Sequence, residues 1–147
     1  PEMSRGLGDV YKRQDVTHLE PLVGTPGLTL ECRDLEAEPW PYAEEAFDAI
    51  IVTNYLYRAH FSHYWRSLKS GGLFLMETFT TVNTAIWGRP RSPEHVLQPG
   101  ELLRLAPQEA RICAYEEGLN ADELGLERIV WLKPGDAEVL ALRLGAR

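Results

Sequence analysis

Three short apolar segments, each followed by polar residues, constrain the fold of this chain more than any other feature. The segments 47–52 and 73–76 are apolar runs, typical of strands that are covered on both faces, as in a parallel sheet. The segment 28–32 is a third candidate strand. Ligands of open α/β sheets bind outside the carboxyl ends of the strands. We therefore expect a site where the residues that follow the segments meet: Asp34 and Leu35, Asn54 and Tyr55, and Glu77 and Thr78.

The segment 57–69 has the clearest helical pattern. Its apolar residues follow the i, i+3, i+4, i+7 spacing of one helix face, and Gly71 and Gly72 suit the exit from a helix. Together with the strands on either side it predicts a right-handed βαβ unit. We expect the apolar stripe to belong to the core; it consists of Phe61, Tyr64, Trp65 and Leu68.

The C-terminal third is predicted to be mixed. We expect a short helix over 99–105 and a strand over 111–116. Strands over 127–133 and 137–144 are joined by Lys-Pro-Gly-Asp, which fits a type II turn and predicts a hairpin. The segment 80–98 lacks clear periodicity, and a loop of that length is usually functional or disordered.

The order of motifs between residues 34 and 73 resembles the middle of a class I S-adenosylmethionine-dependent methyltransferase. The span contains an acid, a Pro-aromatic pair, a Phe-Asp pair opening a buried strand, a helix, and a Leu-Lys-Ser-Gly-Gly turn before the next strand. Ser70 stands where that family usually has proline. The segments 77–79, 88–90 and 97–102 resemble a tellurite-resistance-like bacterial branch.

The resemblance implies a fold, a cofactor and a set of roles. The fold would be α/β, with a Rossmann-like, mostly parallel methyltransferase sheet, a C-terminal antiparallel hairpin, and an antiparallel strand inserted beside the fifth. The cofactor would be S-adenosylmethionine and the acceptor a small molecule. Asp34 and Leu35 would bind adenine, and Asn54 would orient the methionine part. Tyr55 would face the sulfonium by cation–π attraction, or else pack against the helix.

The acceptor side would follow the strand that ends near Glu77. Glu77 could act as a base or hold substrate, although a surface role is equally consistent with its position. Thr78, Trp87 and His95 would bind the acceptor. Methyl transfer needs no metal ion, and His60 and His63, three residues apart, are at most half a metal site.

The family's opening module is missing from this sequence. Residues 6–8 read Gly-Leu-Gly, but position 11, where a cofactor loop needs a third glycine, is Tyr11. We expect residues 1–14 to be a non-native or disordered leader and residues 15–147 a partial, N-terminally truncated domain, itself inactive. Such a sheet would lack its first two strands and expose an apolar edge, through which the chain would self-associate.

Composition restricts the remaining function classes. The formal net charge of −7 argues against a nucleic-acid groove, and no apolar run is long enough to span a membrane. We expect a cytoplasmic protein, with Cys32 and Cys113 buried in strands. Two alternatives stay open: an inactive or non-catalytic Rossmann-like module, and a nucleotide-dependent oxidoreductase fragment.

Overall fold

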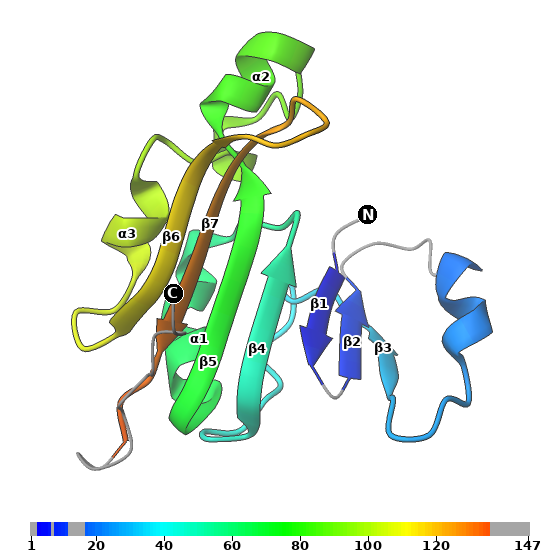
Figure 1. Ribbon diagram of the computed structural model, residues 1–147. Helices are drawn as coiled ribbons and strands as arrows, with labels where there is room; N and C mark the ends of the chain where they lie inside the picture. Colours follow the sequence, from blue (N-terminus) through cyan, green and yellow to red (C-terminus); the bar gives the residue numbers. More distant parts are fainter. Residues whose placement is uncertain (1–2, 7, 12–16, 136–147) are drawn as a thin grey trace, which may run out of the picture.

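The computed structural model describes residues 3–6, 8–11 and 17–135, with only the backbone before Leu19. Within this part, a mixed sheet has the strand order β3-β2-β1-β4-β5-β7-β6 (Figure 1). The strands are β1 (Met3–Gly6), β2 (Gly8–Tyr11), β3 (Leu30–Cys32), β4 (Phe47–Thr53), β5 (Leu68–Phe79), β6 (Arg111–Leu119) and β7 (Gly125–Leu132). The helices are η1 (Thr17–Leu22), η2 (Arg58–His60), α1 (Phe61–Ser67), α2 (Thr81–Trp87), η3 (Pro93–His95) and α3 (Glu101–Leu105).

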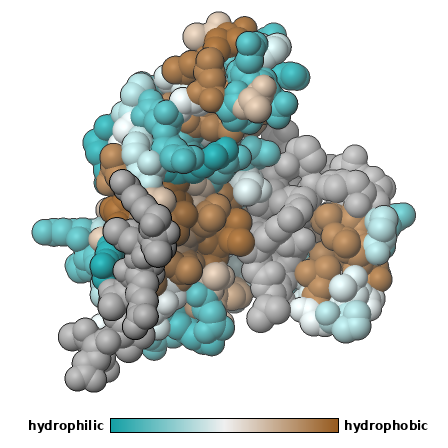
Figure 2. Space-filling view, in the orientation of Figure 1, coloured by the Kyte–Doolittle hydropathy of each residue, from teal (hydrophilic) through white to brown (hydrophobic). Residues whose placement is uncertain are grey.

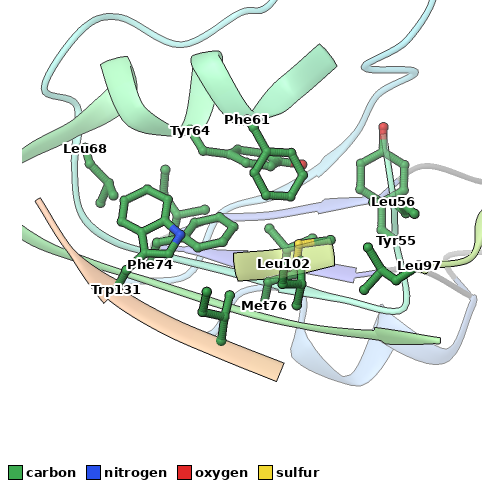
Figure 3. Close-up of a cluster of buried hydrophobic side chains, with 13 residues drawn as sticks. Tyr55, Leu56, Phe61, Tyr64, Leu68, Phe74, Met76, Leu97, Leu102 and Trp131 are labelled. Carbon is green, nitrogen blue, oxygen red and sulfur yellow. The ribbon is translucent and has the colours of Figure 1, made fainter. Parts of the chain in front are cut away.

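The apolar stripe of the predicted helix lies in the core, as expected. Phe61, Tyr64 and Leu68 are buried, and Trp65 packs against the same cluster. Tyr64 and Phe74 lie close together beneath α1, and the Phe74 ring stacks on that of Trp131 at 4.5 Å between centroids (Figure 3). The helix is shorter than predicted, because Leu68 is already extended and begins the twelve-residue strand β5.

The opposite face of the sheet is partly open. Along β5, Phe74 and Met76 are fully buried, whereas Leu73 and Leu75, which alternate with them, are 41% and 36% exposed. Since successive side chains of a strand point to opposite faces, only one face of β5 is covered by α1 and its neighbours. Figure 2 shows the uncovered apolar area at the centre of the view. Leu75 is flanked there by Ile51 of β4 and Val130 of β7.

The sheet is mixed, so the expectation of a mostly parallel sheet was wrong. Of the six neighbouring strand pairs, only β2–β3 and β4–β5 are parallel. The strand β7 runs antiparallel to both β5 and β6, between them. The inserted antiparallel strand beside the fifth is therefore present.

The predicted C-terminal hairpin has a different partner. The strand β7 pairs with β6 through the loop 120–124, and its other edge pairs with β5. Both edges are occupied over residues 126–132, so β7 has no edge left for a hairpin through the predicted turn at 133–136. The predicted strand 137–144 lies outside the described residues.

The two strand positions that we expected to be empty are filled. Residues 3–6 and 8–11 form a hairpin whose strands fill the two positions between β3 and β4. Without it, the facing edges of β3 and β4 would present unpaired backbone groups. The strand β1 runs antiparallel to β4, so the hairpin is not the pair of parallel strands that the resemblance implies.

Two smaller expectations also need correction. The segment 80–98 contains α2 and η3 rather than one irregular loop. Cys32 and Cys113 are free thiols as expected, but both are exposed rather than buried. Each lies on a strand at an outer edge of the sheet, where less of the molecule packs over it. In the described part of the chain, every helix is too short or too polar to cross a lipid bilayer.

Candidate functional site

The carboxyl ends of β3, β4 and β5 share one rim of the sheet. The strands β4 and β5 are parallel, and the pairings through β1 and β2 make β3 parallel to them as well. The rim therefore brings the ends of all three predicted strands to one side of the molecule. The residues that follow these three strands differ in how exposed they are and in which partners they contact.

Asp34 shapes the turn that follows β3. Its Oδ1 accepts hydrogen bonds from the backbone N–H groups of Glu36 and Ala37, both at 3.1 Å. This is the capping role that competes with adenine binding for the same carboxylate. Leu35, next in the chain, is buried, so the turn is fixed on one side by packing and on the other by these bonds.

The end of β4 is joined to that turn through Tyr55. The Tyr55 hydroxyl donates to Oε1 of Glu36 at 3.2 Å, and its ring is only 5% exposed. Asn54, just before it, has a left-handed backbone with φ of 52°. Its N–H donates to the Glu77 carbonyl at 2.9 Å while the residue stays exposed at the rim. Asn is among the residues that tolerate this conformation best.

The end of β5 divides its two polar residues between opposite faces. The Glu77 carboxylate accepts from the Arg128 guanidinium on β7 at 2.6 Å, and Arg128 also contacts Glu116 at 3.1 Å. Hydrogen bonding to Glu77 raises the pKa of Arg128. Thr78 is 1% exposed and points into the core. Glu77 is therefore available to a ligand only together with its Arg128 partner.

The two aromatic candidates of segment 80–98 lie in separate hollows. Trp87, on α2, borders a hollow of about 670 Å³ beyond the end of β5. His95, on η3, borders a smaller hollow of about 270 Å³ near the end of β4, together with Glu36 and Tyr57. The structure thus brings His95 to the turn of Asp34 and places Trp87 elsewhere.

An ion pair that the sequence did not reveal fixes the wall of the smaller hollow. Arg58 donates to both carboxylate oxygens of Glu101, at 2.6 and 3.1 Å, and to the carbonyls of Glu94 and Val96. Burial acts to raise the pKa of Glu101, but the bonds from Arg58 and Gln98 outweigh it and lower that pKa. The pair joins η2 to the start of α3. Its partners are 43 residues apart, a separation at which sequence spacing carries no signal.

The histidine pair near α1 is enclosed by aromatic rings. Nδ1 of His60 and Nδ1 of His63 lie 3.2 Å apart, and the Trp40 ring stacks on His63. Desolvation lowers the pKa of His63. Nowhere in the described part of the chain do three or more His, Cys, Asp or Glu side chains form a group that could hold a metal ion.

No protein-family model matches the sequence, and no curated protein matches it. Solved structures do match. An S-adenosylmethionine-dependent methyltransferase from Mesorhizobium loti superposes with a TM-score of 0.63 over 84% of this chain and 78% of that one, at 14% identity. The N-methyltransferase NodS from Bradyrhizobium japonicum WM9 gives 0.62 over 86% of this chain and 72% of its own, also at 14%. The chain has the fold of the S-adenosylmethionine-dependent methyltransferases.

A third match limits what the methyltransferase fold implies. The [4+2]-cyclase SpnF superposes with a TM-score of 0.63 over 85% of this chain, at 15% identity. This chain spans 64% of the length of SpnF, which is less than two thirds. Because proteins described as a methyltransferase and as a cyclase share this fold, the fold by itself does not determine the reaction.

Proposed function

We propose that this chain is the C-terminal part of an S-adenosylmethionine-dependent methyltransferase that acts on a small-molecule acceptor. The observation that carries the proposal is the position of β7, which runs antiparallel between β5 and β6, next to parallel strands that share a polar rim. An inserted antiparallel strand favours a methyltransferase over a nicotinamide-dependent dehydrogenase, which would use the same rim. The tellurite-resistance-like branch, a bacterial origin and a cytoplasmic location belong to the same proposal.

The rim residues fit the adenine end of the cofactor. Asp34 is exposed in a turn that its own Oδ1 already orders, so the backbone of Leu35 is preset before any ligand binds. Tyr55 is buried under the rim and supports the turn through Glu36 rather than presenting its ring face. Asn54 is exposed at the end of β4, where it would orient the methionine part. The bound cofactor would supply the methyl group on its sulfonium.

The ribose part of the cofactor lacks a comparable set of contacts in the described residues. The positions between β3 and β4 hold the antiparallel β1–β2 hairpin, and its sequence has Tyr11 where a cofactor loop needs a third glycine. We therefore propose that a preceding segment of a longer protein supplies that loop, with residues 1–14 as a non-native leader. The 147-residue chain alone would then be inactive.

The acceptor side is supported by a different set of contacts. Glu77 would act as a base only after leaving Arg128, so a positioning role in which the pair acts together fits the geometry better. Thr78 would help to position the end of β5 from inside the core. Trp87 and His95 border different hollows, so the acceptor would meet one of them directly, and we assign that contact to Trp87.

Equilibrium dialysis with labelled S-adenosylmethionine tests the proposal. We compare the 147-residue chain with a longer chain in which residues 1–14 are replaced by the sequence that precedes residue 15 in the gene. Each lost hydrogen bond removes roughly 0.5–1.5 kcal/mol, so only the longer chain is expected to bind in the micromolar range. Failure of the longer chain to bind would remove the proposed function. Tight binding by the shorter chain would remove the truncation argument.

Substitutions in the longer chain test the roles along the rim. Asp34→Ala is expected to weaken cofactor binding, whereas Asp48→Ala, the same change at the opposite rim, is expected to leave it unchanged. Asp48 is paired with Lys69 at 3.1 Å, away from the site. Glu77→Gln is expected to lower turnover with little effect on cofactor affinity. Equal losses of cofactor affinity for Asp34→Ala and Glu77→Gln would contradict the division into adenine and acceptor ends.

A further inference from the structure

The hollow beside Trp87 is a candidate binding site apart from the residues that follow β3 and β4. It lies beyond the carboxyl end of β5, between α2 and the loop that joins β6 to β7, which stand next to each other in Figure 1. Its volume of about 670 Å³ is within the range of small-molecule pockets, roughly 300–1,000 Å³. Apolar surface is contributed mainly by Phe79, Trp87 and Leu124.

The walls of this hollow are held by buried hydrogen bonds. Asn83 of α2 is 2% exposed; its Nδ2 donates to the Arg89 carbonyl at 2.8 Å, and its Oδ1 accepts from the Gly125 N–H at 3.0 Å. The two backbones lie so close together here that a Cβ on Gly125 would lie 2.6 Å from the backbone nitrogen of Asn83. Thr84 adds a bond from its hydroxyl to the Pro90 carbonyl at 2.8 Å. The hollow is therefore preformed rather than assembled around a ligand.

Trp87 connects the two walls. Its Nε1 donates to the Glu123 carbonyl of the β6–β7 loop at 2.9 Å, which fixes the indole ring. Nevertheless 47% of Trp87 is exposed, an unusual degree for a tryptophan whose polar atom is already satisfied. A fixed and exposed aromatic ring offers apolar contact at little cost in side-chain entropy.

Residues of opposite charge line the two walls of the hollow. Arg89 follows α2, and Asp122 lies on the β6–β7 loop. Among the described residues, neither side chain forms a hydrogen bond or ion pair with another. A purely anionic ligand would be placed near the Asp122 carboxylate, and a purely cationic one near the Arg89 guanidinium. A ligand that carries both signs satisfies both walls at once.

We propose that this hollow binds a free amino acid with an apolar side chain. The carboxylate pairs with Arg89, the ammonium group pairs with Asp122, and the side chain lies against Trp87 and Phe79. The binding itself is independent of methyl transfer. The further step, that this amino acid or a relative of the same charge pattern is the methyl acceptor, rests on the proposed function.

Three probes that differ only in charge test the proposal on the 147-residue chain. L-phenylalanine carries both groups, 3-phenylpropionate only the carboxylate, and phenethylamine only the ammonium. Titrations are followed by NMR through the indole N–H signal that Trp87→Phe removes, and far-UV circular dichroism verifies the folded state of each sample. L-phenylalanine is expected to bind about tenfold or more tightly than either analogue, because each charge-assisted bond contributes that much.

Charge-removing variants with matched controls separate the two walls. Arg89→Gln should reduce the affinity for L-phenylalanine without reducing that for phenethylamine. Asp122→Asn should likewise reduce the affinity for L-phenylalanine without reducing that for 3-phenylpropionate. The controls are Arg91→Gln and Glu123→Gln, the same charge changes at neighbouring residues that do not line the hollow. Equal binding of all three probes, no binding of any, or equal effects of the controls would overturn the proposal. None of these outcomes depends on cofactor binding by the longer chain, so failure of the proposed function stays distinguishable.

Discussion

Glu127 has no exposed surface, although it carries an ionisable carboxyl. Its Oε1 accepts from the Leu102 N–H at 3.1 Å and from the Tyr115 hydroxyl at 2.5 Å. Burial raises its pKa above the ordinary value of 4.5, against the opposing effect of these two bonds, and the nearby carboxylates of Glu117 and Glu101 add to the rise. The folded chain therefore holds the Glu127 proton more tightly than the unfolded chain does.

This buried carboxyl predicts a pH-dependent stability. The stabilisation from the retained proton is complete below the unfolded pKa of 4.5 and decreases as the pH rises toward the folded pKa. Glu127→Gln removes this titration, so the difference in free energy of unfolding between the variant and the parent should grow from pH 4.5 upward. Urea unfolding at a series of pH values measures it. Glu109→Gln, at an exposed position, is the control, and parallel curves for all three proteins would contradict the prediction.

Asp34 gives a second prediction at the level of one side chain. Asp34→Ala removes the acceptor of two backbone N–H groups and should destabilise the chain by about 1 kcal/mol, as for the loss of a capping residue. Asp34→Asn keeps an acceptor oxygen and should stay close to the parent. Urea midpoints measure both. A loss for Asn as large as that for Ala would show that the charge matters and the capping bonds do not.

Two adjacent glycines in the first half of β5, Gly71 and Gly72, are required for different structural reasons. Gly71 has a φ of +81° with open space around its Cα, so Gly71→Ala should cost about 1 kcal/mol of backbone strain. A Cβ on Gly72 would lie 2.8 Å from the Lys69 carbonyl and 3.0 Å from that of Asp48. Gly72→Ala should therefore cost more, about 3 kcal/mol, because it forces β4 and β5 apart.

Thermal and urea unfolding of the two glycine variants, side by side, measures this difference. The prediction would be wrong if Gly71→Ala were the more damaging substitution. Both variants keep the same composition, so their unfolded states are equivalent and the comparison isolates the folded state.

Among the helices and strands, local residue spacing predicted some elements correctly, whereas the pairing of strands could not be predicted from it. The spacing of Phe61, Tyr64 and Leu68 marked α1 because that helix buries one face. The helix α2 was missed because Val82 and Ile86, at i and i+4, are 41% and 48% exposed, and its polar residues form the contacts instead. The β7 hairpin was assigned to the wrong neighbour because the Lys-Pro-Gly-Asp sequence at 133–136 is only local evidence for a turn, whereas the partners of β7 are decided by the whole sheet.

The rim residues show the same limit at the candidate site. Strand ends predicted which residues share the rim, since parallel strands place their carboxyl ends together. The partners of those residues were not predictable: Arg128 lies 51 positions from Glu77, and Arg58 lies 43 from Glu101. Long-range ion pairs leave no periodic trace in a sequence.

At the scale of the whole molecule, the uncovered sheet face predicts self-association. An apolar area around Leu73 and Leu75 remains in contact with water, so copies of the chain are expected to associate. Leu75→Glu should shift the population toward the monomer in sedimentation velocity. Leu103→Glu, at an exposed leucine of α3 outside this face, is the control and should change nothing. A monomeric parent chain at all concentrations would contradict the prediction.

The same open face has a thermal consequence. Unfolding raises the heat capacity because it exposes apolar surface, by about 12–15 cal/mol/K per residue in ordinary domains. A folded state in which one face of the sheet is already exposed to solvent exposes less additional apolar surface on unfolding. Calorimetry of the dilute chain should therefore give a smaller increment per residue, and a value within the ordinary range would contradict this. The curve of stability against temperature would then be flatter, so that cooling and warming alter the folded fraction more gradually.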